Sequence, residues 1–144
     1  MDETKSRYIV KGCGILLCIL FFTLPLVQCS QDSSLTASGW EIATGTGKLY
    51  SYMGGGYEGD ALVFVLLVIP VVLVVLAFLN KSFAILRNVS AVGLAAKIIF
   101  LLAANVRVNS ADFKGAYVLT GGNWLIVFLY IGLVGITFYY AKRE

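Results

Sequence analysis

The sequence predicts an all-α membrane protein in which four transmembrane helices form a bundle. Of its 144 residues, 59% are hydrophobic and only 13% are charged, and the mean hydropathy is +0.87. A soluble domain carries about 25% charged residues, so a soluble fold of this composition would lack the polar surface that water requires. Four apolar stretches reach the length of about 17–25 residues that a helix needs to cross a bilayer. The chain is short enough to form one domain, residues 1–144.

The first span is expected at residues 8–28, with the ammonium of Lys11 reaching the lipid headgroups. Pro25 falls inside this span and predicts a kink. The string Leu26-Val27-Gln28-Cys29 has the Leu-x-x-Cys form in which bacterial lipoprotein signals end, but a small residue normally precedes that cysteine. Because Gln28 is not small, we expect a retained helix rather than a removed signal peptide.

The other spans are expected at residues 61–79, 88–105 and 124–141. The second is uninterrupted apart from Pro70, which predicts another kink. The third contains a lysine, Lys97. The fourth begins at Trp124 and ends near Tyr139 and Tyr140, which suits aromatic side chains at the two membrane interfaces. Backbone polar groups in lipid must be satisfied internally, and none of the stretches alternates as barrel strands do, so each is predicted to be a helix.

Lysine and arginine residues predict the orientation, because cytoplasmic loops carry an excess of them. Seven lie near span ends on one side: Lys5, Arg7, Lys11, Lys81, Arg87, Lys142 and Arg143. Three lie on the other side: Lys48, Arg107 and Lys114. Both termini and the connection 80–87 are therefore expected in the cytoplasm, and segments 29–60 and 106–123 outside it. We expect a multi-pass protein of the cell membrane, located in the inner membrane of a bacterium.

The two outer segments favour a small β element. Residues 35–45 place Thr, Trp and Ile among turn residues, which indicates a short strand or hairpin. Residues 116–120 alternate between glycines in a similar way. Either the two segments pair into a small sheet that caps the bundle, or they remain loops. Their aromatic side chains are of the kind enriched in interface cores, although such residues also anchor to headgroups. They are Trp40, Tyr50, Tyr52, Tyr57 and Tyr117.

One string resembles a known group of proteins. Phe21-Phe22-Thr23-Leu24-Pro25 is followed by Val27, Cys29, a polar stretch and Ser38-Gly39-Trp40-Glu41-Ile42-Ala43-Thr44-Gly45. This resembles a segment of small bacterial four-helix membrane proteins, which has phenylalanines, Leu-Pro, Val-x-Cys and then Ser-Gly-x-x-Leu-Ala-Thr-Gly. Ile42 stands where leucine is common. The resemblance covers residues 21–45, and it implies a four-helix membrane fold but no particular activity.

Lys97 is the strongest candidate functional residue. It lies roughly 12–14 Å from either end of its expected span, at about 1.5 Å per residue. A lysine at that depth costs about 2.5–3.5 kcal/mol and is by default a functional candidate. No acidic residue lies at matching depth, so a proton relay within one chain lacks its second member. We expect Lys97 to face protein or water, in a structural, intersubunit or transport role, with snorkelling to the membrane surface as the alternative.

Two further candidates lie in the first outer segment. Cys29 is expected to be exposed at the outer boundary, as a free thiol, an intermolecular bridge or a lipid attachment site. Trp40 is a candidate for contacts with other chains. The sequence has no histidine, which rules out Ser/His and Cys/His pairs and makes catalysis improbable. We therefore expect no enzyme, no cofactor and no metal, and the sequence offers no basic patch for nucleic acid.

The leading functional hypothesis is a non-enzymatic accessory or structural subunit, in a membrane complex or a homo-oligomer. Its partners would be the lipid bilayer and other membrane subunits or copies of itself, because small residues on the third and fourth spans allow close helix packing. One alternative is a small channel or transporter, with Lys97 and the proline-kinked helices lining a path. Another is a membrane-anchored module whose outer segment binds a ligand.

Overall fold

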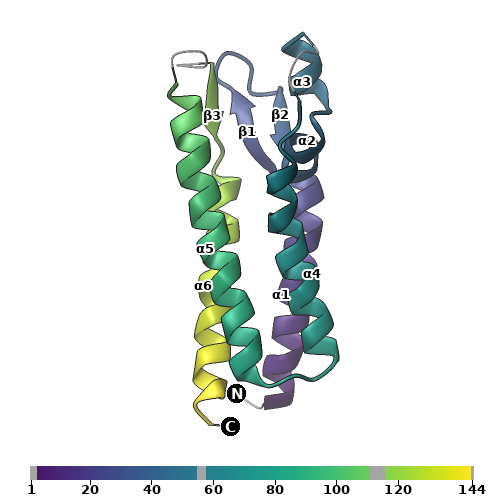
Figure 1. Ribbon diagram of the computed structural model, residues 1–144, viewed down its shortest axis with the longest axis vertical. Helices are drawn as coiled ribbons and strands as arrows, with labels where there is room; N and C mark the ends of the chain where they lie inside the picture. The colour runs from purple at the N-terminus through teal and green to yellow at the C-terminus, as the bar shows by residue number, and fades with distance from the viewer. Residues whose placement is uncertain (1–2, 55–57, 111–115, 144) are drawn as a thin grey trace.

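Four long helices stand side by side, and a small sheet with two short helices lies at one end of them (Figure 1). This computed structural model describes residues 3–54, 58–110 and 116–143. Among these residues, four helical segments are long and apolar enough to cross a membrane: Glu3–Thr23, Ala61–Phe78, Phe83–Val108 and Gly122–Ala141. The prediction of four such helices is therefore confirmed. Two residues named in the sequence analysis, Lys114 and Tyr57, lie outside the described residues.

The long helices form an up-down-up-down bundle. They are α1 (Glu3–Thr23), α4 (Val65–Phe78, extended at its start by the 3₁₀ turn η1, Ala61–Phe64), α5 (Phe83–Val108) and α6 (Gly122–Ala141). Each packs on the next in a closed ring, because α1 also contacts α6. The two termini and the α4–α5 connection lie together at one end, called here the terminal end, and the sheet lies at the other, the sheet end (Figure 1). This arrangement agrees with the relative sides predicted from the charges.

The helices pack through spaced apolar residues. On α1 the buried positions include Val10, Gly14, Leu17 and Phe21, three or four residues apart, as one face of a helix requires. The outward faces are apolar as well: the exposed hydrophobic side chains include Val68, Ile99, Leu102 and Phe128. A helix that is hydrophobic on all sides is typical of a membrane span or of the core of a large protein.

The expected first span is wrong at its end. Helix α1 stops at Thr23, and the next segment, Pro25–Cys29, is strand β1. The physical reason is Pro25, which restricts the residue before it to an extended conformation and cannot continue a helix. As the first residue of the strand, Pro25 occupies a position that tolerates proline. It therefore ends the helix instead of kinking it, whereas Pro70 does lie inside α4, as predicted.

Strand β1 is the centre of a three-stranded antiparallel sheet in the order β2-β1-β3. The partners are β2 (Thr36–Ser38) and β3 (Tyr117–Leu119), one from each outer segment. Val27 of β1 is paired with Ala37 on one side and with Leu119 on the other. The predicted cap of the bundle is thus present, but its two strands are joined through β1, a segment that the sequence analysis placed in a transmembrane helix.

Of the short strand or hairpin expected within residues 35–45, the structure has the strand, β2, and a helix follows it in place of a second strand. After β2, Ser38 caps helix α2 (Gly39–Thr44): its hydroxyl accepts from the Glu41 amide, and the Glu41 carboxylate accepts from the Ser38 amide. This reciprocal capping box satisfies two amides that would otherwise lack partners. Gly45 ends the helix in the left-handed region, at φ 68°. A second short helix, α3 (Lys48–Tyr52), follows.

Candidate functional site

Lys97 lies inside the bundle, as expected of a residue that faces protein or water. Only 1% of it is exposed, and its ammonium donates to the side-chain oxygen Oδ1 of Asn123, 2.8 Å away. The ammonium also lies 4.6 Å from the centre of the Phe100 ring, within cation–π range. Because Asn123 is in the first turn of α6, the ammonium reaches the sheet end of the bundle and not its middle.

Asn123 connects this lysine to the sheet. Its side-chain nitrogen Nδ2 donates to the carbonyl of Leu26, at 2.7 Å, and to that of Thr120, at 3.1 Å. Thr120 is itself fixed on β1, because its amide donates to Leu26 and its hydroxyl donates to the Pro25 carbonyl. One side-chain amide thus joins α5, α6 and the central strand. We call Lys97, Asn123, Thr120 and the carbonyl of Leu26 the lysine clamp.

The surroundings of the lysine clamp are apolar and tightly packed. A cavity of about 10 Å³ adjoins the lysine, lined also by Leu17, Phe21, Leu66, Ile126 and Tyr130. That volume is at the lower limit for one water molecule. Within the described residues no carboxylate forms an ion pair with Lys97. The clamp can therefore hold a charge in place by one amide and one ring face, and it offers no space for a substrate.

Sequence reasoning missed Asn123 because it considered only acids as partners for the lysine. Asn123 stands directly before Trp124, at the start of the fourth expected span, and it was placed in the outer segment. The available signal was a polar side chain at a helix start, able both to accept from the ammonium and to donate to a carbonyl. A buried polar group is normally hydrogen-bonded, so Lys97 required some acceptor in the fold.

Trp40 lies on α2 in an aromatic cluster at the sheet end. Its ring centre is 5.4 Å from that of Phe22 and 5.7 Å from that of Phe64, and 42% of the residue is exposed. An open groove of about 310 Å³ runs beside it, between the end of α1, β2 and α2. Phe22, Trp40 and Glu41 are among the residues that line this groove, called here the tryptophan groove.

The expectation that Cys29 is exposed is wrong. Only 7% of Cys29 is exposed, and it packs in a small cluster with Ala37 and Leu49 under α3. The reason is that β1 carries it into the sheet, where its amide donates to the carbonyl of Leu35. Its thiol is free, but its burial argues against a bridge to another chain or a lipid attachment. The three candidate residues thus belong to three different clusters and form no common site.

An ion pair at the sheet end joins the end of α5 to the start of η1. Arg107 at the end of α5 forms an ion pair with Asp60, at 2.8 Å, and Asp60 caps η1 by accepting from the amide of Leu62. Burial raises the pKa of Tyr50, the Asp60 charge raises it further, and Arg107 partly opposes both effects.

The pKa of Asp32, in the turn before β2, is lowered because its carboxylate accepts from the hydroxyl and amide of Ser34.

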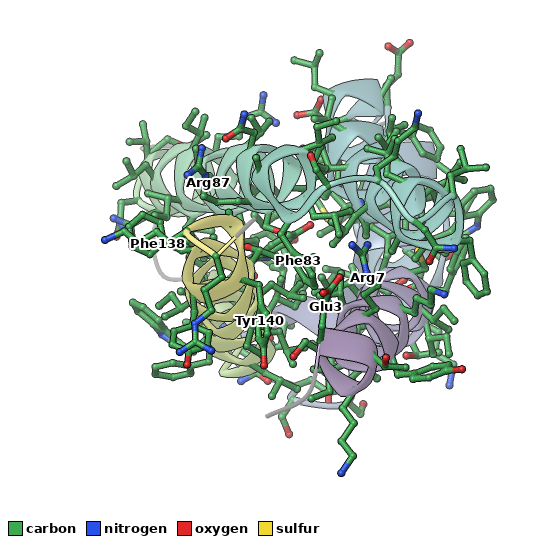
Figure 2. All side chains as sticks on the ribbon, turned by 90° about the horizontal axis from the view of Figure 1, so that it is seen from below. Glu3, Arg7, Phe83, Arg87, Phe138 and Tyr140 are labelled. Atoms are coloured by element: carbon green, nitrogen blue, oxygen red, sulfur yellow. The ribbon has the colours of Figure 1, made fainter. Side chains whose placement is uncertain are left out.

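A second polar cluster closes the terminal end. The Arg7 guanidinium binds Glu3 at 3.1 Å and donates to the carbonyl of Lys81 at 2.9 Å. It also lies 4.6 Å from the centre of the Phe83 ring, and Phe83 stacks on Tyr140 at 5.1 Å. Figure 2, which looks at the terminal end, shows these side chains meeting between α1, α6 and the start of α5. Arg7 thus links α1 to the α4–α5 connection and to the start of α5, and Phe83 continues the contact to α6.

In the described part of the chain, no three Cys, Asp or Glu residues are grouped as metal ligands would be. Comparison of the chain with protein-family models, with curated proteins and with solved structures finds no match. The function must therefore be inferred from the geometry.

Proposed function

We propose that this chain is a non-enzymatic multi-pass membrane protein that acts as an accessory or structural subunit, in a complex or as a homo-oligomer. In this proposal the four long helices hold the protein in the bilayer. The sheet with α2 and α3, called here the head, makes contacts outside it. The terminal end lies in the cytoplasm, because it carries seven lysines and arginines near span ends while the head carries fewer.

The observation that carries this proposal is the lysine clamp. An intramembrane lysine is by default a candidate for a transport path. Here Lys97 is 1% exposed, and its ammonium is held by an amide that also binds β1. The charge thus has a structural use, which is to fasten the head to the bundle. A head that is fixed in orientation suits recognition of a partner, because it loses little conformational freedom when the partner binds.

The channel alternative draws less support from these contacts. The cavity beside Lys97 holds at most about one water, and the side chains that line it are otherwise mostly aliphatic or aromatic. The ligand-binding alternative has a specific observation in its favour, the tryptophan groove. Its volume of about 310 Å³ is at the lower end of the range of small-molecule sites, about 300–1,000 Å³.

The test is the mass of the particle that the chain forms. Purified in mild detergent, the protein is expected to run as an oligomer or with a larger membrane partner, as measured by light scattering and by mass spectrometry of the copurified chains. A monodisperse monomer that alone moves an ion or solute across liposomes would favour the transporter instead.

A further inference from the structure

The tryptophan groove combines features that select one class of ligand. It is lined by residues from the end of α1, from β2 and from α2, so it lies beside the last apolar turn of a long apolar helix. Aromatic rings form one part of its lining, and a carboxylate and hydroxyl groups form another. Polar residues outnumber apolar ones in this lining, so the groove suits a polar or charged group that is held against an aromatic face.

The aromatic part of the groove is held rigidly. The Trp40 ring is tilted by 34° against Phe22 and meets the Phe64 ring edge-on, at 74°. Phe22 in turn meets Phe21, which is buried. These contacts fix the indole while leaving 42% of the residue exposed. The exposed face of a tryptophan attracts cations more strongly than that of any other side chain, and quaternary ammonium groups are recognised in this way.

Among the residues that the structure describes, no cation is paired with the carboxylate in the groove. Glu41 accepts from the Ser38 amide at 2.8 Å, which fixes its orientation, and its other oxygen lies against Gly47. No lysine or arginine among the described residues forms an ion pair with it, whereas Glu3 pairs with Arg7 and Asp60 pairs with Arg107. A fixed negative charge next to an exposed indole favours a cationic group in the groove.

An apolar surface continues from the groove along α1. Ile15, Ile19 and Phe22 are exposed and follow one another at spacings of four and three residues, so they lie on one face of the helix. This exposed surface runs along the outside of α1, from the groove towards the middle of the length of the helix. A ligand that presents a cation to the groove and an alkyl chain to this face would match both.

We propose that the tryptophan groove binds the headgroup of a zwitterionic phospholipid, phosphatidylethanolamine or phosphatidylcholine. The ammonium lies over Trp40 and beside Glu41, and an acyl chain lies along Ile19 and Ile15. This proposal rests on the membrane insertion proposed above. The alkyl surface favours a lipid over a free ammonium compound, because only the lipid covers both the groove and the helix face.

The experiment is a comparison of lipid binding by native mass spectrometry of the full chain in detergent, with phosphatidylethanolamine, phosphatidylcholine and phosphatidylglycerol added separately. The third lipid lacks the ammonium. The parent chain is expected to bind each of the first two at least about fivefold more tightly than the third, since a cation–π contact contributes about 1 kcal/mol. Glu41→Gln, which keeps an acceptor for the Ser38 amide, and Trp40→Leu are each expected to abolish most of that preference.

The matched controls are Glu58→Gln and Trp124→Leu, which change an exposed carboxylate and an exposed tryptophan outside the groove. Both are expected to keep the preference. Equal binding of the three lipids by the parent would overturn the proposal, as would a preference that survives Glu41→Gln and Trp40→Leu. Binding of tetramethylammonium without any lipid preference would identify a free ammonium ligand and would also overturn it.

Failure of the membrane proposal is detected separately. A chain that alkaline carbonate extracts from membranes would contradict insertion itself. A chain that resists extraction and shows no headgroup preference would contradict only the lipid site.

Discussion

The ammonium of Lys97 and the side-chain oxygen of Asn123 lie 2.8 Å apart, although 26 positions separate them in the chain. Their contact joins the third long helix to the first turn of the fourth, and the same asparagine binds β1 through the Leu26 carbonyl. The pair is fully buried. Removing Asn123 therefore costs more than the free energy of one hydrogen bond, because it leaves an ammonium without an acceptor in apolar surroundings.

The first prediction concerns this pair. Asn123→Leu is expected to destabilise the protein by about 2–4 kcal/mol, because the charge of Lys97 remains buried without its acceptor. The double variant Lys97→Met/Asn123→Leu removes the charge as well and is expected to be more stable than Asn123→Leu alone, by about 1 kcal/mol or more. Thermal unfolding in detergent measures both effects.

The control for the clamp is Lys48→Met, an exposed lysine of α3, which is expected to change stability by less than about 0.5 kcal/mol. If Lys97→Met and Asn123→Leu both changed stability as little as this control does, the lysine clamp would not stabilise the fold.

A second prediction compares two buried hydroxyls. Ser90 on α5 is fully buried, and its hydroxyl has no hydrogen-bond partner among the described residues. Thr137 on α6 is equally buried, but its hydroxyl donates to the Leu133 carbonyl at 2.7 Å. Ser90→Ala should therefore be neutral or stabilising, by up to about 1 kcal/mol, since it removes an unsatisfied polar group.

Thr137→Val is the matched variant and should cost about 0.5–1.5 kcal/mol, because it removes a hydroxyl that is bonded. Unfolding curves of the two variants in the same detergent give the comparison. A loss of stability from Ser90→Ala as large as that from Thr137→Val would mean that the Ser90 hydroxyl has a partner in the purified protein.

A third prediction concerns Arg7 at the terminal end. Arg7→Gln is expected to cost about 1–2 kcal/mol, because it removes the bond to the Lys81 carbonyl and the cation–π contact with Phe83. Glu3→Gln removes only the exposed ion pair and should cost no more than about 0.5 kcal/mol. Arg7→Lys should not restore stability fully, since an ammonium lacks the planar group that reaches both partners.

These stabilities are again read from thermal unfolding, with Lys5→Gln as the control for loss of one positive charge near the same helix end. If Arg7→Gln and Lys5→Gln lowered stability equally, Arg7 would contribute only through its positive charge and not through its specific contacts.

A fourth prediction uses the titration of Tyr50. Its pKa is raised in the folded protein, so the folded state keeps the phenol proton where the unfolded state has lost it. The stability that Tyr50 contributes is therefore fully present below pH about 10, the ordinary pKa, and is lost as the pH rises through the folded value. Phenolate absorbance of the parent minus that of Tyr50→Phe isolates this group.

The charges around Tyr50 can be tested individually. Asp60→Asn should lower its pKa towards the ordinary value, and Arg107→Gln should raise it further, because these charges act in opposite directions. A Tyr50 titration that does not respond to either variant would place the phenol away from the Arg107–Asp60 pair.

Much of the fold follows from features that the sequence displays directly. Length and hydropathy locate four long apolar helices, because these depend on the composition of contiguous segments. The end of the first helix was misplaced because Leu26 and Val27 continue its apolar run, so hydropathy extends the span beyond Pro25. The local rule for proline gives the correct boundary, and here it outweighs hydropathy.

The candidate site was harder to predict because it depends on contacts between distant segments. Lys97 could be singled out from its place in an apolar stretch, but its partner Asn123 is set by the packing of α5 on α6. Cys29 was misjudged for a related reason. Its burial arises only when β1 pairs with β2 and α3 covers it, and the segment was expected to leave the membrane as an exposed loop.

The last prediction concerns orientation. The terminal end is expected in the cytoplasm and the head outside, since seven of the lysines and arginines near span ends belong to the terminal end. Single cysteines at Lys48 and Lys142 test this, because both residues are exposed and lie at opposite ends of the bundle. A membrane-impermeant maleimide added to intact cells should label Lys48→Cys and should label Lys142→Cys only after permeabilisation. The parent chain supplies the background, which should be low because Cys29 is buried and Cys13 and Cys18 lie within α1. The reverse pattern, with Lys142→Cys labelled in intact cells, would place the head in the cytoplasm and contradict the assignment.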